Sequence, residues 1–188
     1  MDEKAIIANS RAGDREAFGK LYDRYVRRIY AYIFFKTRHR ETAEDLTSET
    51  FVKALQHIGR LDPTKPFAPW LYTIARNTIR DYYRAKGNAP HADIEDVWDL
   101  ASDDDAGANA EEALRTRTIA AYLRDLSAHE RDIIMLRVWQ ELSYGEIAAV
   151  LGVSAGASKM TYSRAVGKLR KVVPEGLAVL ALLELFIS

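Results

Sequence analysis

Three arginines spaced four residues apart, Arg76, Arg80 and Arg84, line one face of a predicted helix. Aromatic residues precede and interleave with this row, among them Phe67 and Trp70. Opened nucleic acid is bound by this combination, because bases stack on aromatic rings while arginines contact the backbone phosphates. We therefore predict a surface for melted or single-stranded nucleic acid. The alternative is that the aromatic rings belong to the core.

Residues 143–172 have the pattern of a helix-turn-helix, with a short helix, a turn at Gly152–Ser154 and a longer basic helix. From Ile147 to Pro174 the chain carries five basic residues and no acidic one. Such a helix can present its basic face to the major groove of DNA. The alternative is a helical hairpin with a solvated basic face. On the second helix the predicted core side is Ser158, Tyr162, Ala165, Leu169 and Val172, and the opposite side is Gly156, Met160, Arg164 and Lys171, flanked by Lys159 and Ser163.

Residues typical of catalysis do not cluster in this sequence. Cysteine is absent, and the four histidines are scattered without the spacing of metal ligands. No glycine-rich phosphate loop follows a strand pattern. The run Asp103–Asp105 is interpreted as part of a solvated linker rather than as a Mg²⁺ site. We therefore expect no enzymatic activity, no metal and no cofactor.

The elements that must position these residues are predicted to be helices throughout, because apolar residues recur at helical spacing and no segment alternates like a half-buried strand. Asp14 is a predicted N-cap, and Pro69 is expected to be the first residue of a helix. Two capping boxes are predicted, Ser127–Glu130 and Ser143–Glu146. The helix in the region of residues 43–58 is expected to bury Ala43, Leu46, Phe51, Leu55 and Ile58.

Charge divides the chain into segments, although its formal net charge is zero. Residues 1–86 carry 17 basic and 11 acidic side chains, residues 87–112 carry 9 acidic and no basic ones, and residues 113–188 carry 10 basic and 7 acidic ones. We predict an all-α fold in which an acidic linker joins two small helical domains. The expected boundaries are 1–88 and 112–173 for the domains, 89–111 for the linker and 174–188 for an apolar C-terminal tail.

Four ordered motifs over roughly residues 5–172 resemble the sigma factors of bacterial RNA polymerase, of the extracytoplasmic-function (ECF) type in the sigma-70 family. AGDREAFGKLYDRYVRRIYAY resembles the start of sigma domain two, and ETAEDLTSETFVKAL its polymerase-gripping segment. PFAPWLYTIARNTIRDYYR is similar to the segment that reads and melts the promoter −10 element. The stretch from LSAHERD to VGKLR is similar to domain four, which reads the −35 element.

This resemblance assigns expected roles to individual residues. The polymerase contact is expected at Asp45, Leu46, Glu49, Phe51 and Lys53, with the exposed members favoured and Phe51 a candidate for the core. The −10 contact is expected at Lys65, Phe67, Trp70 and Asn77, together with the row Arg76, Arg80 and Arg84. The −35 contact is expected at Ser154, Gly156, Lys159, Met160, Ser163, Arg164, Lys168 and Lys171.

The resemblance also implies partners. These are core RNA polymerase, through the clamp helices of its largest subunit and the flap of its second-largest subunit, then promoter DNA and an anti-sigma factor. A cytoplasmic location without membrane insertion is expected, because the apolar run 177–187 is shorter than a membrane helix. Two other functions remain open, an autonomous helix-turn-helix regulator that binds duplex DNA without polymerase, and an adaptor that has lost promoter reading.

The acidic linker and the apolar tail each have two interpretations. The linker either mimics the RNA backbone inside a positively charged polymerase channel or is a passive spacer that repels free DNA. The tail either packs on domain four or is a docking or self-masking segment.

Overall fold

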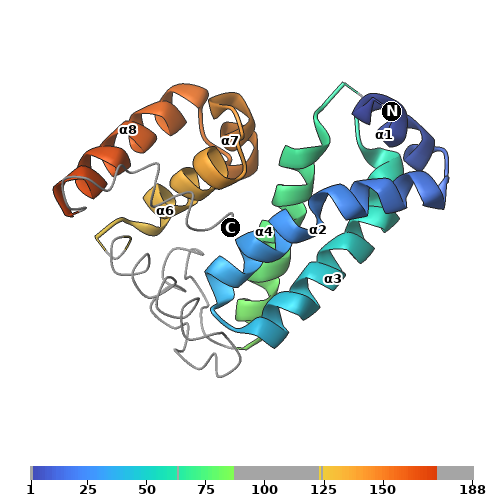
Figure 1. The fold of residues 1–188 in the computed structure, drawn as a ribbon, viewed down its shortest axis with the longest axis horizontal. Coiled ribbons are helices and arrows are strands. Elements are labelled where there is room, and N and C mark those ends of the chain that lie inside the picture. Colours follow the sequence, from blue (N-terminus) through green and yellow to red (C-terminus); the bar gives the residue numbers. More distant parts are fainter. Residues whose placement is uncertain (1, 63, 87–122, 124, 173–188) are drawn as a thin grey trace. The chain divides into compact units, whose positions relative to one another are not determined.

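The computed structural model describes residues 2–62, 64–86, 123 and 125–172, so the hypotheses for the acidic linker and the C-terminal tail lie outside the described residues. The described residues form helices and connecting turns, and the chain divides into two compact units (Figure 1). The first contains α1–α4 and the second α6–α8. In the part of the chain that the structure describes, no helix is both long and apolar enough to cross a membrane.

The first unit begins with α1 (Glu3–Arg11) and α2 (Arg15–Thr37). Asp14 caps α2 as predicted, since its Oδ1 accepts the backbone N–H groups of Glu16 and Ala17 at 2.9 and 3.1 Å. Helix α1 was not predicted from the sequence. A helix this short is marginal alone and depends on tertiary packing, here the burial of Ile6 and Ile7.

Helix α3 (Arg40–His57) continues into the 3₁₀ turn η1 (Ile58–Arg60), and α4 (Phe67–Ala85) follows. Figure 1 shows α2, α3 and α4 side by side, and their facing sides form the core. Helix α4 begins two residues earlier than predicted, with Pro66 at the N-cap. Pro69 lies within the first turn, where its missing N–H costs nothing because the first N–H groups of a helix have no partner inside it. Fully buried core side chains of this unit include Leu21, Ile29, Tyr32, Ile33, Phe35, Phe67, Leu71, Tyr72 and Ile79.

The second unit contains α6 (Ala128–Ile134), which continues into a π-helical segment η3 (Met135–Trp139), then α7 (Tyr144–Leu151) and α8 (Ala155–Val172). Both predicted capping boxes are present, at the starts of α6 and α7. Gly152 ends α7 in the left-handed region, at φ 73°, which glycine adopts without steric cost. The turn leads directly into α8, and this confirms the helix-turn-helix.

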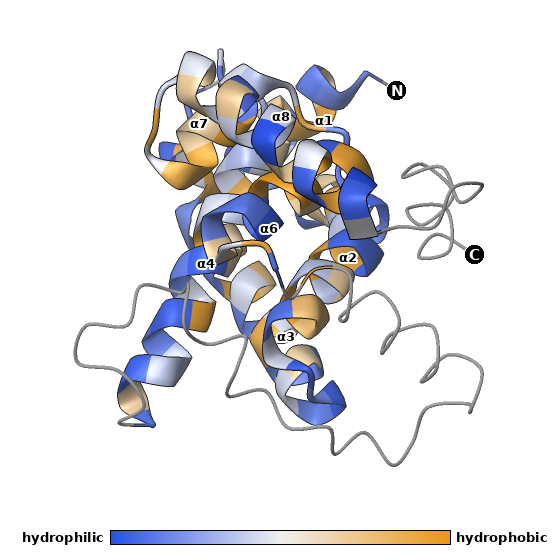
Figure 2. Cartoon of the chain, turned by 90° about the vertical axis from the view of Figure 1, so that its left-hand side faces the viewer, coloured by the Kyte–Doolittle hydropathy of each residue, from blue (hydrophilic) through white to orange (hydrophobic). Residues whose placement is uncertain are grey.

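Each unit is held together by the packing of its own amphipathic helices, in which hydrophobic and hydrophilic residues alternate along the ribbon (Figure 2). On α8 the predicted core positions Ser158, Ala165 and Leu169 are buried. Ser158 is a polar residue at such a position, and its hydroxyl donates a hydrogen bond to the carbonyl of Ser154 at 3.2 Å. This bond satisfies the buried hydroxyl, so the core tolerates it.

Truncation of α4 on its inner face should destabilise the first unit. Leu71→Ala removes a fully buried side chain, and we expect a loss of about 2–5 kcal/mol in the free energy of unfolding. Val52→Ala is the matched control, because Val52 is 52% exposed and its truncation should change stability by about 0.5 kcal/mol or less. Denaturant unfolding followed by circular dichroism measures both. Equal losses for the two variants would contradict the assigned core.

Candidate nucleic-acid and partner interfaces

The arginine row lies along α4, on the part of the helix that does not face the core. Arg80 and Arg84 are exposed, whereas Arg76 and Asn77 are half-buried. The buried Nε of Arg76 has no hydrogen-bond partner among the described residues. The guanidinium of Arg84 pairs with Asp81 of the same helix, with Nη2 2.9 Å from Oδ1. The row therefore presents two exposed cations, and one of them is already held by a carboxylate.

The two aromatic residues at the start of α4 differ in exposure. Phe67 is fully buried and belongs to the core, whereas Trp70 is half-buried. Their ring centroids lie 5.6 Å apart. Phe67 therefore packs against Trp70 and, being buried, does not offer a stacking surface itself. The exposed Lys65 lies in the loop before α4. Of the two aromatic residues predicted to contact DNA, only Trp70 is partly exposed, and Phe67 is out of reach of a partner in this conformation.

Helix α1, which was not predicted from the sequence, also contributes to the packing around Phe67. The ring of Tyr25 lies 5.3 Å from that of Phe67, and its hydroxyl donates to Glu3 Oε2 at 2.9 Å. Burial and then the Glu3 carboxylate raise the pKa of Tyr25, so the phenol stays protonated and can donate. Glu3 also pairs with Arg24 at 2.7 Å. A sequence signal for this arrangement is the pair Ile6–Ile7, which marks an apolar side on an otherwise polar segment.

The residues expected to grip polymerase divide between the two sides of α3. Leu46 and Phe51 are each 4% exposed, so their side chains belong to the core and position their neighbours. Asp45 and Glu49 are exposed on the outer side, and Lys53 is partly exposed. Burial thus removes Leu46 and Phe51 from the side chains that a partner can touch in this conformation.

Two apolar side chains on α3 are exposed beside these charges. Val52 is 52% and Leu55 46% exposed. The predicted burial of Leu55 was wrong, because Ala54 and not Leu55 faces the core at this turn of the helix. Val52 was missed as a surface candidate. We name Asp45, Glu49, Val52 and Leu55 the outer α3 face, which combines two carboxylates with two exposed apolar side chains.

On the helix-turn-helix, the side of α8 opposite the core is exposed as predicted. The exposed residues are Gly156, Lys159, Met160, Ser163, Arg164 and Lys171. Ser154 is exposed, but its Oγ accepts the backbone N–H of Ala157 at 3.1 Å and so caps the helix. Helix α8 therefore exposes the cationic side chains of Lys159, Arg164 and Lys171.

Lys168 was predicted to contact DNA, but its Nζ lies 2.7 Å from Glu130 Oε2. The same carboxylate completes the capping box of α6, accepting the N–H of Ser127 at 2.8 Å. Burial alone would raise the pKa of Glu130, but the hydrogen bonds from Lys168 and Ser127 hold it below its ordinary value of 4.5. Lys168 thus ties α8 to α6 by a partly buried ion pair.

Two helical units, one with a basic and aromatic helix and one with a basic helix-turn-helix, define a nucleic-acid-binding protein. Comparison with known families agrees: residues 21–89 match sigma-70 region 2, and residues 116–169 match sigma-70 region 4. The chain belongs to the sigma-70 family of RNA polymerase sigma factors and to its ECF group, as the sequence motifs predicted. The predicted all-α fold with two sigma domains is also confirmed.

Several relatives share most of the chain. The ECF RNA polymerase sigma factor BldN of Streptomyces coelicolor is 33% identical over 172 residues, which are 90% of this chain and 65% of BldN. The RNA polymerase sigma factor YlaC of Bacillus subtilis is 33% identical over 84% of this chain and 92% of YlaC. The ECF RNA polymerase sigma factor SigL of Mycobacterium tuberculosis is 30% identical over 91% of this chain and 97% of SigL. These relatives are sigma factors, which are not enzymes.

Solved structures show the same fold. CnrH in complex with the cytosolic domain of CnrY is similar with a TM-score of 0.71 and 26% identity, over 90% of this chain and 96% of CnrH. The sigma factor RpoE of Bartonella quintana, in a co-crystal with the anti-sigma factor NepR, has a TM-score of 0.61 and 22% identity over 82% of this chain and 95% of RpoE.

The pair Glu130–Lys168 should make the second unit sensitive to acid. Because its folded-state pKa is lowered, ionised Glu130 stabilises the fold above its ordinary pKa, and this contribution is lost as pH falls through the folded-state value. Glu130→Gln should therefore destabilise the second unit at about pH 7 and progressively less towards about pH 3. Urea unfolding of the wild type and the variant at several pH values measures the difference.

Glu146→Gln is the control, because Glu146 completes the equivalent capping box of α7. Because glutamine can also complete a capping box, this variant reports the loss of a carboxylate charge at a helix N-terminus that has no lysine like Lys168 beside it. A Glu130→Gln difference in unfolding free energy that stays constant with pH would contradict the role given to the pair.

Proposed function

We propose that this chain directs promoter-specific initiation by core RNA polymerase and has no catalytic activity of its own. The observation that supports this most is that one chain carries two separate basic surfaces of different kinds. Helix α4 combines exposed arginines with a half-buried tryptophan, which suits opened bases, and α8 presents cations from a helix-turn-helix, which suits the duplex.

The first unit would bind polymerase through the outer α3 face and the −10 element through α4. Extruding a base from the duplex costs a few kcal/mol, and stacking on an aromatic ring returns about 1–3 kcal/mol per base. Trp70 alone therefore offsets this cost at best in part. Contacts of Arg80, Arg84 and Lys65 with phosphates, and binding to polymerase, must supply the rest. This balance explains why opened DNA would be held by the complex with polymerase rather than by the free protein.

The second unit would read the −35 element through α8. Lys159, Arg164 and Lys171 contact phosphates in this proposal, while Met160 and Ser163 face the base edges. Met160 is 56% exposed, and a large apolar side chain is costly to leave in water unless a partner covers it. A methyl-rich edge in the major groove, as thymine presents, would suit it.

We further propose the domain limits 1–88 and 112–173, action in the cytoplasm, and a protein partner of the anti-sigma type. The similar protein CnrH was solved in complex with the cytosolic domain of CnrY. A partner that covers the outer α3 face or α8 would compete with polymerase or promoter DNA for the same residues.

Reconstituted transcription tests the proposal directly. Core polymerase from the source organism, mixed with this chain and a library of genomic fragments, should produce transcripts that start at specific sites and depend on the added chain. The free chain should bind the same fragments weakly. Tight, site-specific binding of duplex DNA without polymerase, and no specific transcript with it, would instead support the autonomous helix-turn-helix regulator.

Two lysines of α8 should separate DNA contact from structural support. Lys159→Ala should weaken promoter binding by the polymerase complex and lower the slope of log affinity against log salt by about 1, because one phosphate contact is lost. Lys168→Ala should mainly lower the unfolding free energy, since its amine is engaged with Glu130. Filter binding at several salt concentrations and thermal unfolding measure the two effects. Equal salt slopes for both variants would contradict this division.

A further inference from the structure

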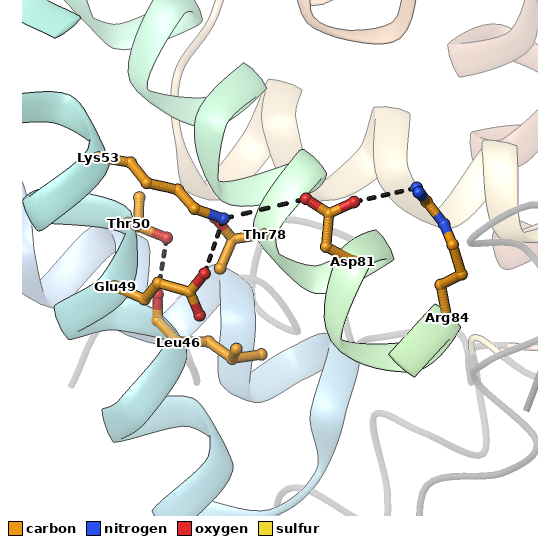
Figure 3. Close-up of polar contacts among 7 residues, drawn as sticks. All are labelled: Leu46, Glu49, Thr50, Lys53, Thr78, Asp81 and Arg84. Atoms are coloured by element: carbon orange, nitrogen blue, oxygen red, sulfur yellow. Dashed lines mark hydrogen bonds and ion pairs between the residues drawn. The ribbon is translucent and has the colours of Figure 1, made fainter. Parts of the chain in front are cut away.

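A connected series of charged side chains runs from the outer α3 face to the arginine row of α4 (Figure 3). At its centre is Lys53, whose amine lies 2.7 Å from Glu49 Oε1 and 3.9 Å from Asp81 Oδ2. The amine also donates to Thr78 Oγ1 at 3.3 Å. The other oxygen of Asp81 holds Arg84 at 2.9 Å. Two carboxylates thus share two cations across the α3–α4 contact.

The two ends of this series of charged side chains lie on different surfaces. Glu49 belongs to the outer α3 face, and Arg84 is the last member of the arginine row. Both ends are accessible, with 47% of the Glu49 side chain and 62% of the Arg84 side chain exposed. Lys53 at the centre is 33% exposed. Asp81 is 50% exposed, so Lys53 is the least exposed member of the series, and both end groups can reach a partner.

The pairs are suited to exchange rather than to permanent binding. Exposed ion pairs contribute little to stability, about 0–1 kcal/mol each, because water and salt screen the charges. The Lys53–Asp81 distance is also long for a charge-assisted hydrogen bond, which is usually about 2.7–2.9 Å. Lys53 thus has a close carboxylate on α3 and a second, more distant one on α4, towards which its flexible side chain can move.

We propose that Lys53 and Asp81 couple the two surfaces, so that a cationic group docking on Glu49 releases Arg84 to bind a DNA phosphate. A cation on Glu49 withdraws the nearest partner of Lys53, and Lys53 then pairs more closely with Asp81. With its charge engaged by Lys53, Asp81 holds Arg84 less strongly. This inference rests on the proposed function, in which the outer α3 face meets polymerase and Arg84 meets the −10 strand.

The coupling must act in both directions, because binding free energies are linked reciprocally. A phosphate that draws Arg84 away leaves Asp81 to Lys53, and Glu49 becomes more available to a partner's cation. In the free protein Asp81 therefore acts as a positioning residue that suppresses DNA binding by Arg84, and polymerase binding relieves this suppression.

Glu49→Gln tests the coupling in the protein with both units present, because it removes the charge of Glu49 as a docked cation would. We expect affinity for a fluorescein-labelled single-stranded oligonucleotide, measured by anisotropy at low salt, to rise about two- to fivefold. In an Asp81→Asn background Arg84 is already released. Glu49→Gln should there raise the affinity no more than the removal of an unrelated negative charge does. Thermal unfolding confirms that each variant is folded.

Glu44→Gln is that control. Glu44 lies on the same helix and forms the same kind of i,i+4 pair, with Arg40, but is outside the series of charged side chains. It reports the general effect of removing one negative charge. If Glu49→Gln changes affinity by the same factor in both backgrounds, or by no more than Glu44→Gln in the wild type, the coupling is overturned.

Arg84→Ala separates this inference from the function on which it rests. In the Asp81→Asn background it should lower the affinity for the oligonucleotide, since Arg84 is then free to bind phosphate. If it does so while the Glu49 effect is independent of Asp81, the coupling fails and the DNA surface stands. If Arg84→Ala has no effect there, the assignment of Arg84 to DNA fails, and the coupling fails with it.

Discussion

The burial of one side of α4 against α2 and α3 is the interaction on which the other features of the first unit depend. Leu71, Tyr72 and Ile79 are inserted between the neighbouring helices, and the ring of Tyr72 packs edge-on against Tyr32. Because an α-helix repeats every 3.6 residues, burying this side leaves Arg80 and Arg84 facing solvent. The same packing places α3 next to α4, so its outer side is free for a second partner. Apolar packing thus sets the position of both polar surfaces.

Ion pairs within each unit determine which cations are available to a partner. Lys168 is engaged by Glu130 and Arg84 by Asp81, whereas Arg80, Lys159 and Arg164 are exposed. Counting basic residues along a helix therefore overestimates its contacts with phosphate. The two engaged cations also differ, because Glu130 is largely buried and Asp81 is half-exposed. The first pair supports the fold, and the second can exchange partners.

Periodicity and capping rules predicted the helices well where the signal comes from neighbouring residues in the sequence. Asp14, both capping boxes and the turn at Gly152 were readable because each depends on residues within a few positions. Contacts between distant segments were not readable. Lys168 appears as a free cation in the sequence because its partner Glu130 is 38 residues away. Phe67 appears as a candidate stacking ring because the ring that packs on it, Tyr25, comes from another helix and cannot be foreseen from neighbouring residues. Leu55 shows the same limit, since an apolar residue at helical spacing can lie one position outside the buried stripe.

The central claim is that α3 binds polymerase and α4 of the same unit binds the −10 strand. Site-specific photo-crosslinking tests it most directly, with a benzophenone side chain placed at Val52 or at Arg80 in the full chain bound to core polymerase and promoter DNA. We predict that Val52 crosslinks to polymerase with or without DNA, and that Arg80 crosslinks to the −10 strand when polymerase is present. Crosslinking of both positions to the same partner would contradict the account.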